Sequence, residues 1–304
     1  MGKKRSTLLD FVQYGGLKAF VAVIRFLPLN IAVLVGRFMA YAGYVIDRKH
    51  RTIASENIRT AYGDDLSDRQ IEKIIRGLYL HLASVGIDFV KLPRIVNSSN
   101  WQNYFEVEGL EFARKALEAG KGIIFLTGHV GSWEVLGCAI QFLFNQPVHT
   151  IAKHMENPFT DRIITKLRED GGQKIIFSEN AAREMIRVLK HNKLLGILVD
   201  QNAKENSIFV DFFGQKAATT RSAATLSLKM GAPIIMLFAR RIAGHYKFKI
   251  SVSKPIEIEK TGNLEKDVFN LTQLYTTIIE SHIRENPHEW LWIHRRWKTR
   301  PRSA

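Results

Sequence analysis

A histidine and a carboxylate with four residues between them give the clearest chemical signal in this sequence. His129 and Glu134 lie in the stretch 128–134, GHVGSWE, directly after an apolar run. On one continuous helix their spacing would place the two side chains about 140° apart, so the backbone must turn if they are to pair. Gly128 and Gly131 are where such a turn is easiest. A carboxylate that held one imidazole nitrogen would leave the other nitrogen free as a general base.

Other catalytic centres have little support in the sequence. No H-E-x-x-H, G-x-G-x-x-G or P-loop pattern is present, so neither a zinc site nor a nucleotide site is predicted. Ser132 lacks the G-x-S-x-G frame, because Val130 occupies the first glycine position. The single cysteine, Cys138, excludes an internal disulfide and a thiolate metal cluster, and its place on an apolar helix face predicts a buried thiol. Without further context, the default interpretation of His129 would be a loop histidine whose hydrogen bonds are satisfied and which has a structural role only.

Alternating strands and helices are predicted to position these residues. Apolar segments predict strands at 105–107, 122–127, 148–152, 175–177, 194–199, 233–239 and 246–252. Helices are predicted between them at 110–119, 133–144, 158–169, 181–190, 220–230 and 264–284. The pattern indicates an α/β fold with a mainly parallel central sheet flanked by helices. Chemistry in such sheets lies beyond the carboxyl ends of the strands, where His129 follows one strand and Asp200 and Gln201 follow another.

The N-terminal segment differs from the rest and predicts membrane association. It is strongly apolar, but its longest uncharged run, 26–36, is shorter than the roughly 20 residues of a membrane-spanning helix and contains Pro28 and Asn30. Asn30 is expected to cap a second helix just after the proline. We therefore predict two short apolar helices in or near the membrane interface, within residues 1–50, ahead of a catalytic domain at 51–304. A buried helical hairpin on a soluble domain is the alternative.

The charge distribution agrees with a membrane location. The chain has 44 Lys and Arg against 29 Asp and Glu, a formal net charge of +15. Basic residues gather before the apolar segment at Lys3, Lys4 and Arg5, after it at 47–51, and from residue 295 onward among tryptophans. Such clusters suit anionic headgroups and phosphorylated lipids. No nucleic-acid-binding motif accompanies the charge, so nucleic acid is not a predicted partner.

The segment 128–134 resembles the H-x4-D/E signature of glycerolipid acyltransferases, specifically the bacterial lipid A late acyltransferase family. Further motifs of this family match in the same order along nearly the whole chain. They are N-P-x-x-D-R…R-x-x-G-G at 157–172, D-Q at 200–201, F-V-x-F-F-G-x-x-A-x-T-T at 209–220 and W-x-W-x-x-R-R-W-K at 290–298. The sequence departs from the family pattern at Asp211, where proline is more usual, and at 287–289, where P-E-Q is more usual. Neither departure involves the histidine or the glutamate.

The resemblance implies an enzyme of lipid A biosynthesis on the cytoplasmic face of the cell inner membrane. Such an enzyme moves a fatty acyl chain from a thioester, usually on acyl carrier protein, to a hydroxyl of a phosphorylated glycolipid, the lipid A precursor. His129 would deprotonate that hydroxyl, Glu134 would orient His129, and Arg168 would stabilise the oxyanion. Arg168 could instead be a solvated helix arginine. No metal or redox cofactor is required, because a thioester is already activated.

Substrate binding is expected from four further residues, Asp200, Gln201, Arg295 and Arg296. Asp200 could position the acceptor, support the site or cap a strand end, and the two arginines suit a phosphate. Three phenylalanines could line a slot for the acyl chain or pack in the core, namely Phe209, Phe212 and Phe213.

Two alternatives to a lipid A acyltransferase stay open. One is an acyl-CoA-dependent acyltransferase on another glycolipid or phospholipid, such as a phosphatidylinositol mannoside. The other is a non-catalytic peripheral protein that binds anionic lipid. The short histidine motif does not separate these, whereas the D-Q block and the R-R-W-K tail favour the lipid A branch.

Overall fold

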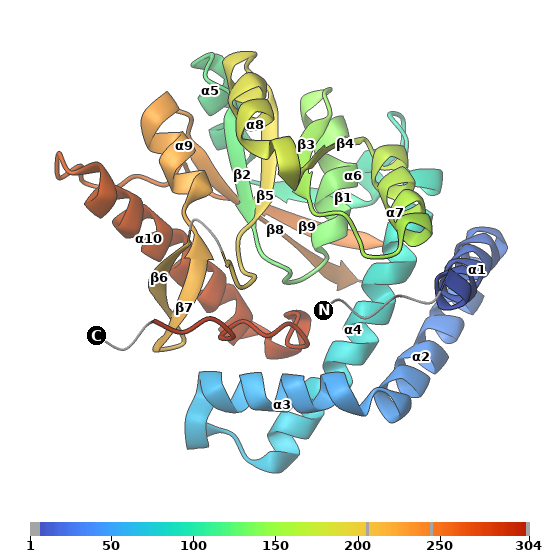
Figure 1. Ribbon diagram of the computed structural model, residues 1–304. Helices are drawn as coiled ribbons and strands as arrows, with labels where there is room; N and C mark the ends of the chain where they lie inside the picture. The colour runs from blue at the N-terminus through green and yellow to red at the C-terminus, as the bar shows by residue number, and fades with distance from the viewer. Residues whose placement is uncertain (1–6, 205–206, 244–245, 302–304) are drawn as a thin grey trace.

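A seven-stranded sheet forms the centre of the protein, and helices flank it (Figure 1). The computed structural model describes residues 7–204, 207–243 and 246–301. The strands, in their order across the sheet, are β1 (Phe105–Glu108), β9 (Lys247–Val252), β8 (Ile234–Ala243), β2 (Ile123–Thr127), β5 (Leu194–Leu198), β3 (Val148–Ala152) and β4 (Gln173–Phe177). Neighbouring strands run parallel except β8 and β9, which are antiparallel. The predicted α/β fold with a mainly parallel sheet is confirmed.

The helices between the strands lie where the sequence predicts them. They are α5 (Leu110–Glu118), α6 (Trp133–Phe144), α7 (Pro158–Asp170), α8 (Ala181–Lys190), α9 (Ser222–Met230) and α10 (Leu264–Glu285). α7 begins as its sequence dictates, because the side chain of Asn157 accepts hydrogen bonds from the first free amides and Pro158 occupies the first helical position. Cys138 is buried in α6, as predicted.

β2 and β5 position the residues of interest. Every residue of β2 is buried, as its continuous apolar sequence predicts for a strand covered on both faces. The two strands are parallel neighbours, and their register pairs Thr127 with Leu198 near their carboxyl ends. The loops at 128–132 and 199–202 therefore leave the sheet at the same edge, close to each other.

A β-hairpin that the sequence patterns did not predict covers residues 207–220. Its strands are β6 (Ser207–Phe212) and β7 (Gln215–Thr220), and the turn between them places Phe213 and Gly214 at φ values of 54° and 70°. Two consecutive residues with positive φ match the twist of a tight hairpin. Phe212 and Phe213 are buried against Trp290 and Trp292, so they belong to the core and do not line an acyl slot.

Two apolar helices precede the sheet domain. α1 (Thr7–Phe26) and α2 (Leu29–Ile46) are longer than predicted, and each is long and apolar enough to cross a membrane by length and composition. Asn30 is not the cap of α2, because the cap position falls on Pro28 and Asn30 lies inside the helix. Only 17% of each apolar window is buried, which disagrees with the buried-hairpin alternative. The basic cluster at 3–5 lies outside the described residues.

Two further helices join these segments to the sheet domain. α3 (Arg48–Tyr62) leads into the long α4 (Asp68–Ile95), which begins at a capping box between Ser67 and Gln70. The inner faces of α1 and α2 contribute Val21, Ile24 and Ala32 to the same hydrophobic cluster as residues of α4, α6 and the sheet. The N-terminal helices are thereby packed on the domain through one face and exposed on the other.

Candidate active site

His129 and Asp200 form a close pair at the carboxyl ends of β2 and β5. His129 Nδ1 lies 2.8 Å from Asp200 Oδ1, and the backbone amide of His129 donates to Asp200 Oδ2 at 2.7 Å. Because a carboxylate accepts, this contact places the imidazole proton on Nδ1 and leaves Nε2 as an acceptor. The side chain of Gln201 lies beside that nitrogen, with its Nε2 3.4 Å from His129 Nε2. Apart from this long contact with Gln201, His129 Nε2 is available as a base.

Asp200 is held in its ionised form by three donors. Its side chain is 2% exposed, and Trp290 Nε1 donates to Oδ2 at 2.7 Å in addition to the two contacts from His129. Burial by itself would raise the pKa of Asp200, but the positive charge that His129 carries when protonated, together with the hydrogen bonds from His129 and Trp290, outweighs burial and lowers the pKa to about 2. A buried negative charge therefore lies directly behind the imidazole.

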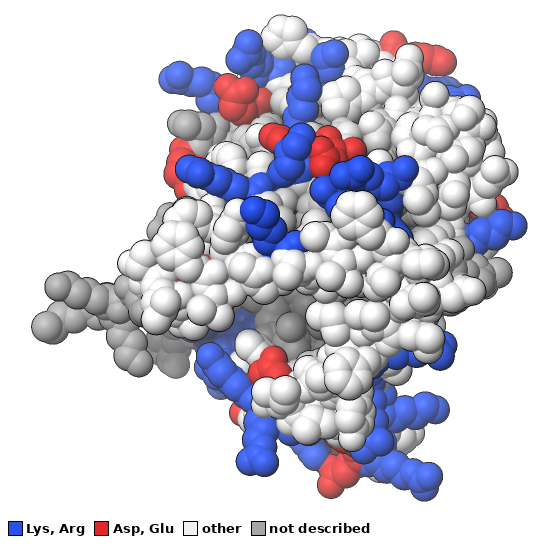
Figure 2. Space-filling view, turned by 90° about the vertical axis from the view of Figure 1, so that its right-hand side faces the viewer, with Lys and Arg blue, Asp and Glu red and all other residues white. Residues whose placement is uncertain are grey.

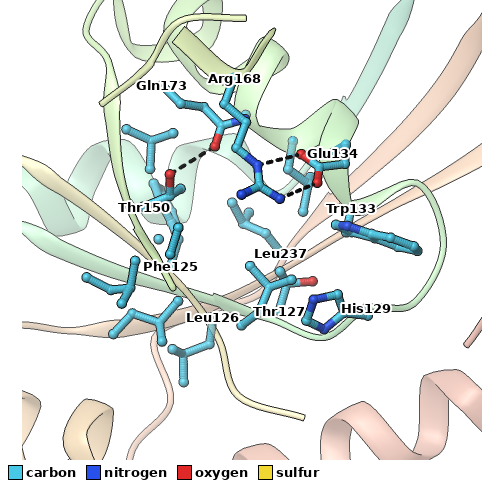
Figure 3. A pocket seen from close by; sticks show the side chains of 18 of the residues that line it. Phe125, Leu126, Thr127, His129, Trp133, Glu134, Thr150, Arg168, Gln173 and Leu237 are labelled. Carbon is cyan, nitrogen blue, oxygen red and sulfur yellow. Dashed lines mark hydrogen bonds and ion pairs between the residues drawn. The ribbon is translucent and has the colours of Figure 1, made fainter. Parts of the chain in front are cut away.

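Glu134 lies in the first turn of α6 and pairs with Arg168 of α7. Arg168 Nη2 donates to Glu134 Oε1 at 2.7 Å, and Arg168 Nε donates to Oε2 at 3.4 Å (Figure 3). Burial by itself would lower the pKa of Arg168, but the carboxylate of Glu134 raises it. Among the described residues, no hydrogen bond or ion pair joins Glu134 to His129. The expected Glu134–His129 contact is therefore replaced by two separate pairs, with Asp200 on His129 and Glu134 on Arg168.

The turn that carries His129 depends on two glycines. Gly131 has a φ of 61°, and a Cβ atom there would lie 2.3 Å from the carbonyl oxygen of Ala239. A Cβ at Gly128 would lie 3.1 Å from the Asp200 carboxylate. His81 of α4 also fixes the turn, because its Nε2 lies 3.0 Å from the Gly131 carbonyl oxygen and donates to it. Burial lowers the pKa of His81 to about 4, so the ring is neutral when it makes this hydrogen bond.

A pocket of about 360 Å³ extends from His129 into the protein. His129, Glu134 and Arg168 line it together with apolar side chains of the central strands and α6, including Leu126, Leu136, Ile140, Val148, Ile197 and Leu237 (Figure 3). Gly137 and Gly196 are also in its wall, and a side chain at Gly196 would contact Thr150 and Val148 at 3.1 and 3.2 Å. The pocket thus joins an apolar interior to the polar groups that could carry the chemistry.

The basic tail residues occupy different surroundings. Arg296 is fully buried, where Nη1 donates to the Ala218 carbonyl at 2.7 Å and the guanidinium lies over the ring of Phe212. Burial lowers the pKa of Arg296 to about 10. The side chain ties the tail to β7 and does not reach the surface, so the structure does not support the phosphate-binding role expected for it. Arg295 is exposed, and its role stays a prediction.

Two residues of the site were missed from the sequence. Trp290 lies in the tryptophan-rich tail, whose sequence predicts a membrane interface, yet it is 1% exposed and contacts Asp200. His81 lies on a helical segment with no motif that singles it out. Among the described residues, no group of three or more His, Cys, Asp and Glu side chains is placed to hold a metal ion.

Comparison with known proteins gives a family match and several acyltransferase relatives. The family described as bacterial lipid A biosynthesis acyltransferase matches residues 3–299. A lipid A biosynthesis acyltransferase of Haemophilus influenzae is 24% identical over 283 residues, which cover 92% of this chain and 86% of the relative. The lipid A biosynthesis palmitoleoyltransferase of Escherichia coli is 24% identical over 281 residues, covering 90% and 87%. The lipid A biosynthesis lauroyltransferase of Escherichia coli is 28% identical over 203 residues, covering 66% and 63%.

Proposed function

This chain belongs to the bacterial lipid A biosynthesis acyltransferase family and is an O-acyltransferase. From that premise we propose that it transfers a fatty acyl chain from acyl carrier protein to a hydroxyl of a lipid A precursor. The observation that carries the proposal is the apolar pocket that ends at His129, whose Nδ1 is held by Asp200. An apolar pocket suits an acyl chain, and a lining histidine whose Nε2 is an acceptor suits the activation of a hydroxyl.

His129 acts as the general base in this proposal. Its Nε2 accepts the proton of the acceptor hydroxyl while the hydroxyl oxygen attacks the thioester carbonyl carbon, forming a carbon–oxygen bond. The tetrahedral intermediate then collapses, the carbon–sulfur bond breaks, and Nε2 returns the proton to the departing sulfur. Asp200 keeps the imidazole oriented and stabilises the imidazolium with its buried charge.

Arg168 stabilises the negative oxygen of the tetrahedral intermediate. Its Nε and Nη2 are occupied by Glu134, whereas Nη1 has no partner among the described residues and the side chain lines the pocket. Glu134 therefore orients Arg168, a role that differs from the one expected from the sequence. Loss of one oxyanion donor typically costs about 10²–10³-fold in rate.

The membrane and the acyl carrier protein are the partners in this proposal. Residues 1–50 associate with the cytoplasmic face of the cell inner membrane through α1 and α2, and residues 51–304 form the acyltransferase domain. The formal charge of +15 favours encounter with an acidic carrier and with a phosphorylated acceptor. Arg295 and Gln201 remain the proposed contacts to the acceptor.

The test is acyl transfer by purified protein in detergent, with the product mass measured by mass spectrometry. We expect His129→Ala to abolish transfer from acyl carrier protein to a lipid A precursor while the protein still binds membranes. His191→Ala is the matched control, because His191 is exposed at the end of α8. Full turnover by His129→Ala would refute the mechanism.

The donor and the acceptor are tested in the same assay. Acyl-CoA replaces the carrier protein in one arm, and a phosphatidylinositol mannoside replaces the lipid A precursor in another. Faster transfer in either arm would overturn the corresponding part of the proposal.

A further inference from the structure

A second cavity, of about 340 Å³, lies between α1 and α7. α7 separates it from the active-site pocket, because Ile164 and Arg168 line the first pocket whereas Arg162, Ile163 and Lys166 line the second. The second cavity takes no part in the acyl transfer proposed above.

The two helices that form this cavity run side by side in the same direction. The rings of Phe11 and Phe159 contact each other near the helix starts, with centroids 4.8 Å apart. Near the helix ends, Arg25 Nη2 and Asp170 Oδ2 form an ion pair at 3.2 Å. The cavity lies between these two contacts, so an aromatic pair and an ion pair flank it along the helices.

The cavity walls carry an excess of positive charge. Lys18, Arg25, Arg162 and Lys166 all line it. Asp170 forms ion pairs with Arg25 and with Lys166, at 3.2 and 2.8 Å. In the described part of the chain, neither Lys18 nor Arg162 forms an ion pair with a carboxylate, and Lys18 Nζ lies 5.6 Å from the centroid of the Tyr14 ring. Two cations therefore face the cavity without a protein anion.

The surroundings of the cavity are apolar. Val21 and Leu167 form a buried part of its wall. Large apolar side chains are exposed on the outward faces of α1 and α2, among them Leu8, Phe11, Val12, Phe26, Leu34 and Phe38. Figure 2 shows this side of the molecule as a broad uncharged area with Lys and Arg side chains gathered along its borders. Apolar surface bordered by cations is typical of a protein face that meets an anionic membrane.

We propose that this cavity binds the phosphate headgroup of an anionic glycerophospholipid of the membrane. Arg162 offers a planar fork that matches two phosphate oxygens, and Lys18 offers a compact charge on the opposite wall. Arg25 and Lys166 add positive charge from the part of the cavity next to Asp170. The acyl chains of the lipid continue along the exposed apolar side chains of α1. The bound lipid fixes the depth and the orientation of the enzyme on the membrane.

A lipid fits this cavity better than an acidic protein does. The two unpaired cations lie in a depression with an apolar wall, and the surface next to the depression is apolar. An acidic protein surface would bury its carboxylates against these apolar side chains without compensation, at a considerable desolvation cost. A phospholipid presents a phosphate for the cations and hydrocarbon for the apolar surface.

The experiment measures the binding of the full chain to vesicles by co-sedimentation. One set of vesicles contains phosphatidylcholine alone, and the other contains phosphatidylcholine with phosphatidylglycerol. The test variant is Lys18→Ala with Arg162→Ala. The control variant, Arg183→Ala with Lys190→Ala, removes the same net charge from exposed positions of α8, which lies away from α1 (Figure 1).

We expect the test variant to bind the phosphatidylglycerol vesicles roughly 30-fold more weakly than wild type, since each basic residue near an anionic surface contributes about 1 kcal/mol. Its binding to phosphatidylcholine should stay unchanged, because the apolar faces of α1 and α2 are intact. The control should change by less than about threefold, because its positions lie away from the apolar face. Lys18→Arg with Arg162→Lys keeps both charges and should restore most of the binding.

Equal losses in the test and control variants would overturn the proposal, since the effect would then be one of net charge. A test variant that binds both vesicles like wild type but no longer accepts acyl chains from acyl carrier protein would also overturn it, in favour of a carrier-docking surface. Neither readout depends on the acyl transfer chemistry, because His129→Ala should bind both vesicles like wild type.

Discussion

Replacement of Trp290 by phenylalanine tests whether the tail holds the active-site carboxylate in place. Trp290 Nε1 donates to Asp200 Oδ2 at 2.7 Å, and phenylalanine lacks this donor. A hydrogen bond to a charged, buried group contributes about 1.5–3 kcal/mol. If most of that energy serves to position the Asp200–His129 pair, kcat should fall by about 10- to 100-fold.

Trp292 provides a matched control for this substitution. It is buried in the same aromatic cluster, with its ring centroid 4.6 Å from that of Trp290, but its Nε1 donates to the carbonyl of Pro287. Trp290→Phe and Trp292→Phe therefore remove the same atoms and one hydrogen bond each. We expect a larger decrease in the melting temperature for Trp290→Phe, because its lost hydrogen bond is to a charged acceptor, and we expect the large decrease in kcat only for Trp290→Phe.

The pH dependence of the rate adds a second readout. The hydrogen bond from Trp290 is one of the contacts that lower the pKa of Asp200 to about 2, so its removal raises that pKa. Because the pKa starts so low, the carboxylate stays ionised at neutral pH and the shape of the pH–rate profile should not change. A kcat of Trp290→Phe equal to that of Trp292→Phe would refute the reasoning and make Trp290 a packing residue only.

Three further predictions concern the turn, the pocket and the buried carboxylate. Gly131→Ala should lower the free energy of unfolding by about 1–3 kcal/mol more than Gly120→Ala in chemical denaturation, because both positions have positive φ but only the first meets a backbone oxygen, at 2.3 Å. Equal losses would contradict the steric argument. Gly196→Val should make the enzyme transfer shorter acyl groups, because the new side chain fills part of the pocket. Each methylene that the pocket no longer buries costs about 0.8 kcal/mol, which is roughly fourfold in kcat/KM. An unchanged chain-length profile of the products, measured by mass spectrometry, would exclude the pocket as the acyl site. Asp200 has a folded-state pKa of about 2 against 3.8 for the free group, so its ionisation stabilises the fold above pH 4 by about 2 kcal/mol and this contribution is lost as the pH falls toward 2. The stability of wild type relative to Asp200→Asn, measured by urea unfolding, should therefore decrease over that interval, and a difference independent of pH would contradict the prediction.

The fold could be predicted from the sequence because its signals are local. The apolar runs of β2 and β5 and the amphipathic helices between the strands each follow from a few neighbouring residues. The rule that parallel strands end at a common edge then brought His129 and Asp200 to one place. The hairpin at 207–220 could not be predicted in this way, because apolar and polar residues do not alternate clearly along its two strands.

The pairing within the site could not be predicted because it depends on distant segments. The spacing between His129 and Glu134 fixes their separation along the chain, but the turn at Gly131 and the start of α6 decide where the glutamate points. Arg168 reaches Glu134 from α7, 34 residues later in the chain. Trp290 contacts Asp200 although the two residues are 90 positions apart in the chain. A contact between such distant residues leaves no pattern in the local sequence, so it could not be predicted.

Because the chain is synthesised from its N-terminus, the tail is the last part of the candidate site to be made. α1 and α2 are made before the sheet domain and expose apolar surface. His129 and Asp200 follow, but Trp290 and the amide of Leu291, which donates to the His129 carbonyl at 3.1 Å, are made much later. In the proposed function, the apolar helices are therefore complete before the catalytic centre is, and an unfinished chain held at the ribosome has its general base, His129, without the support of the tail.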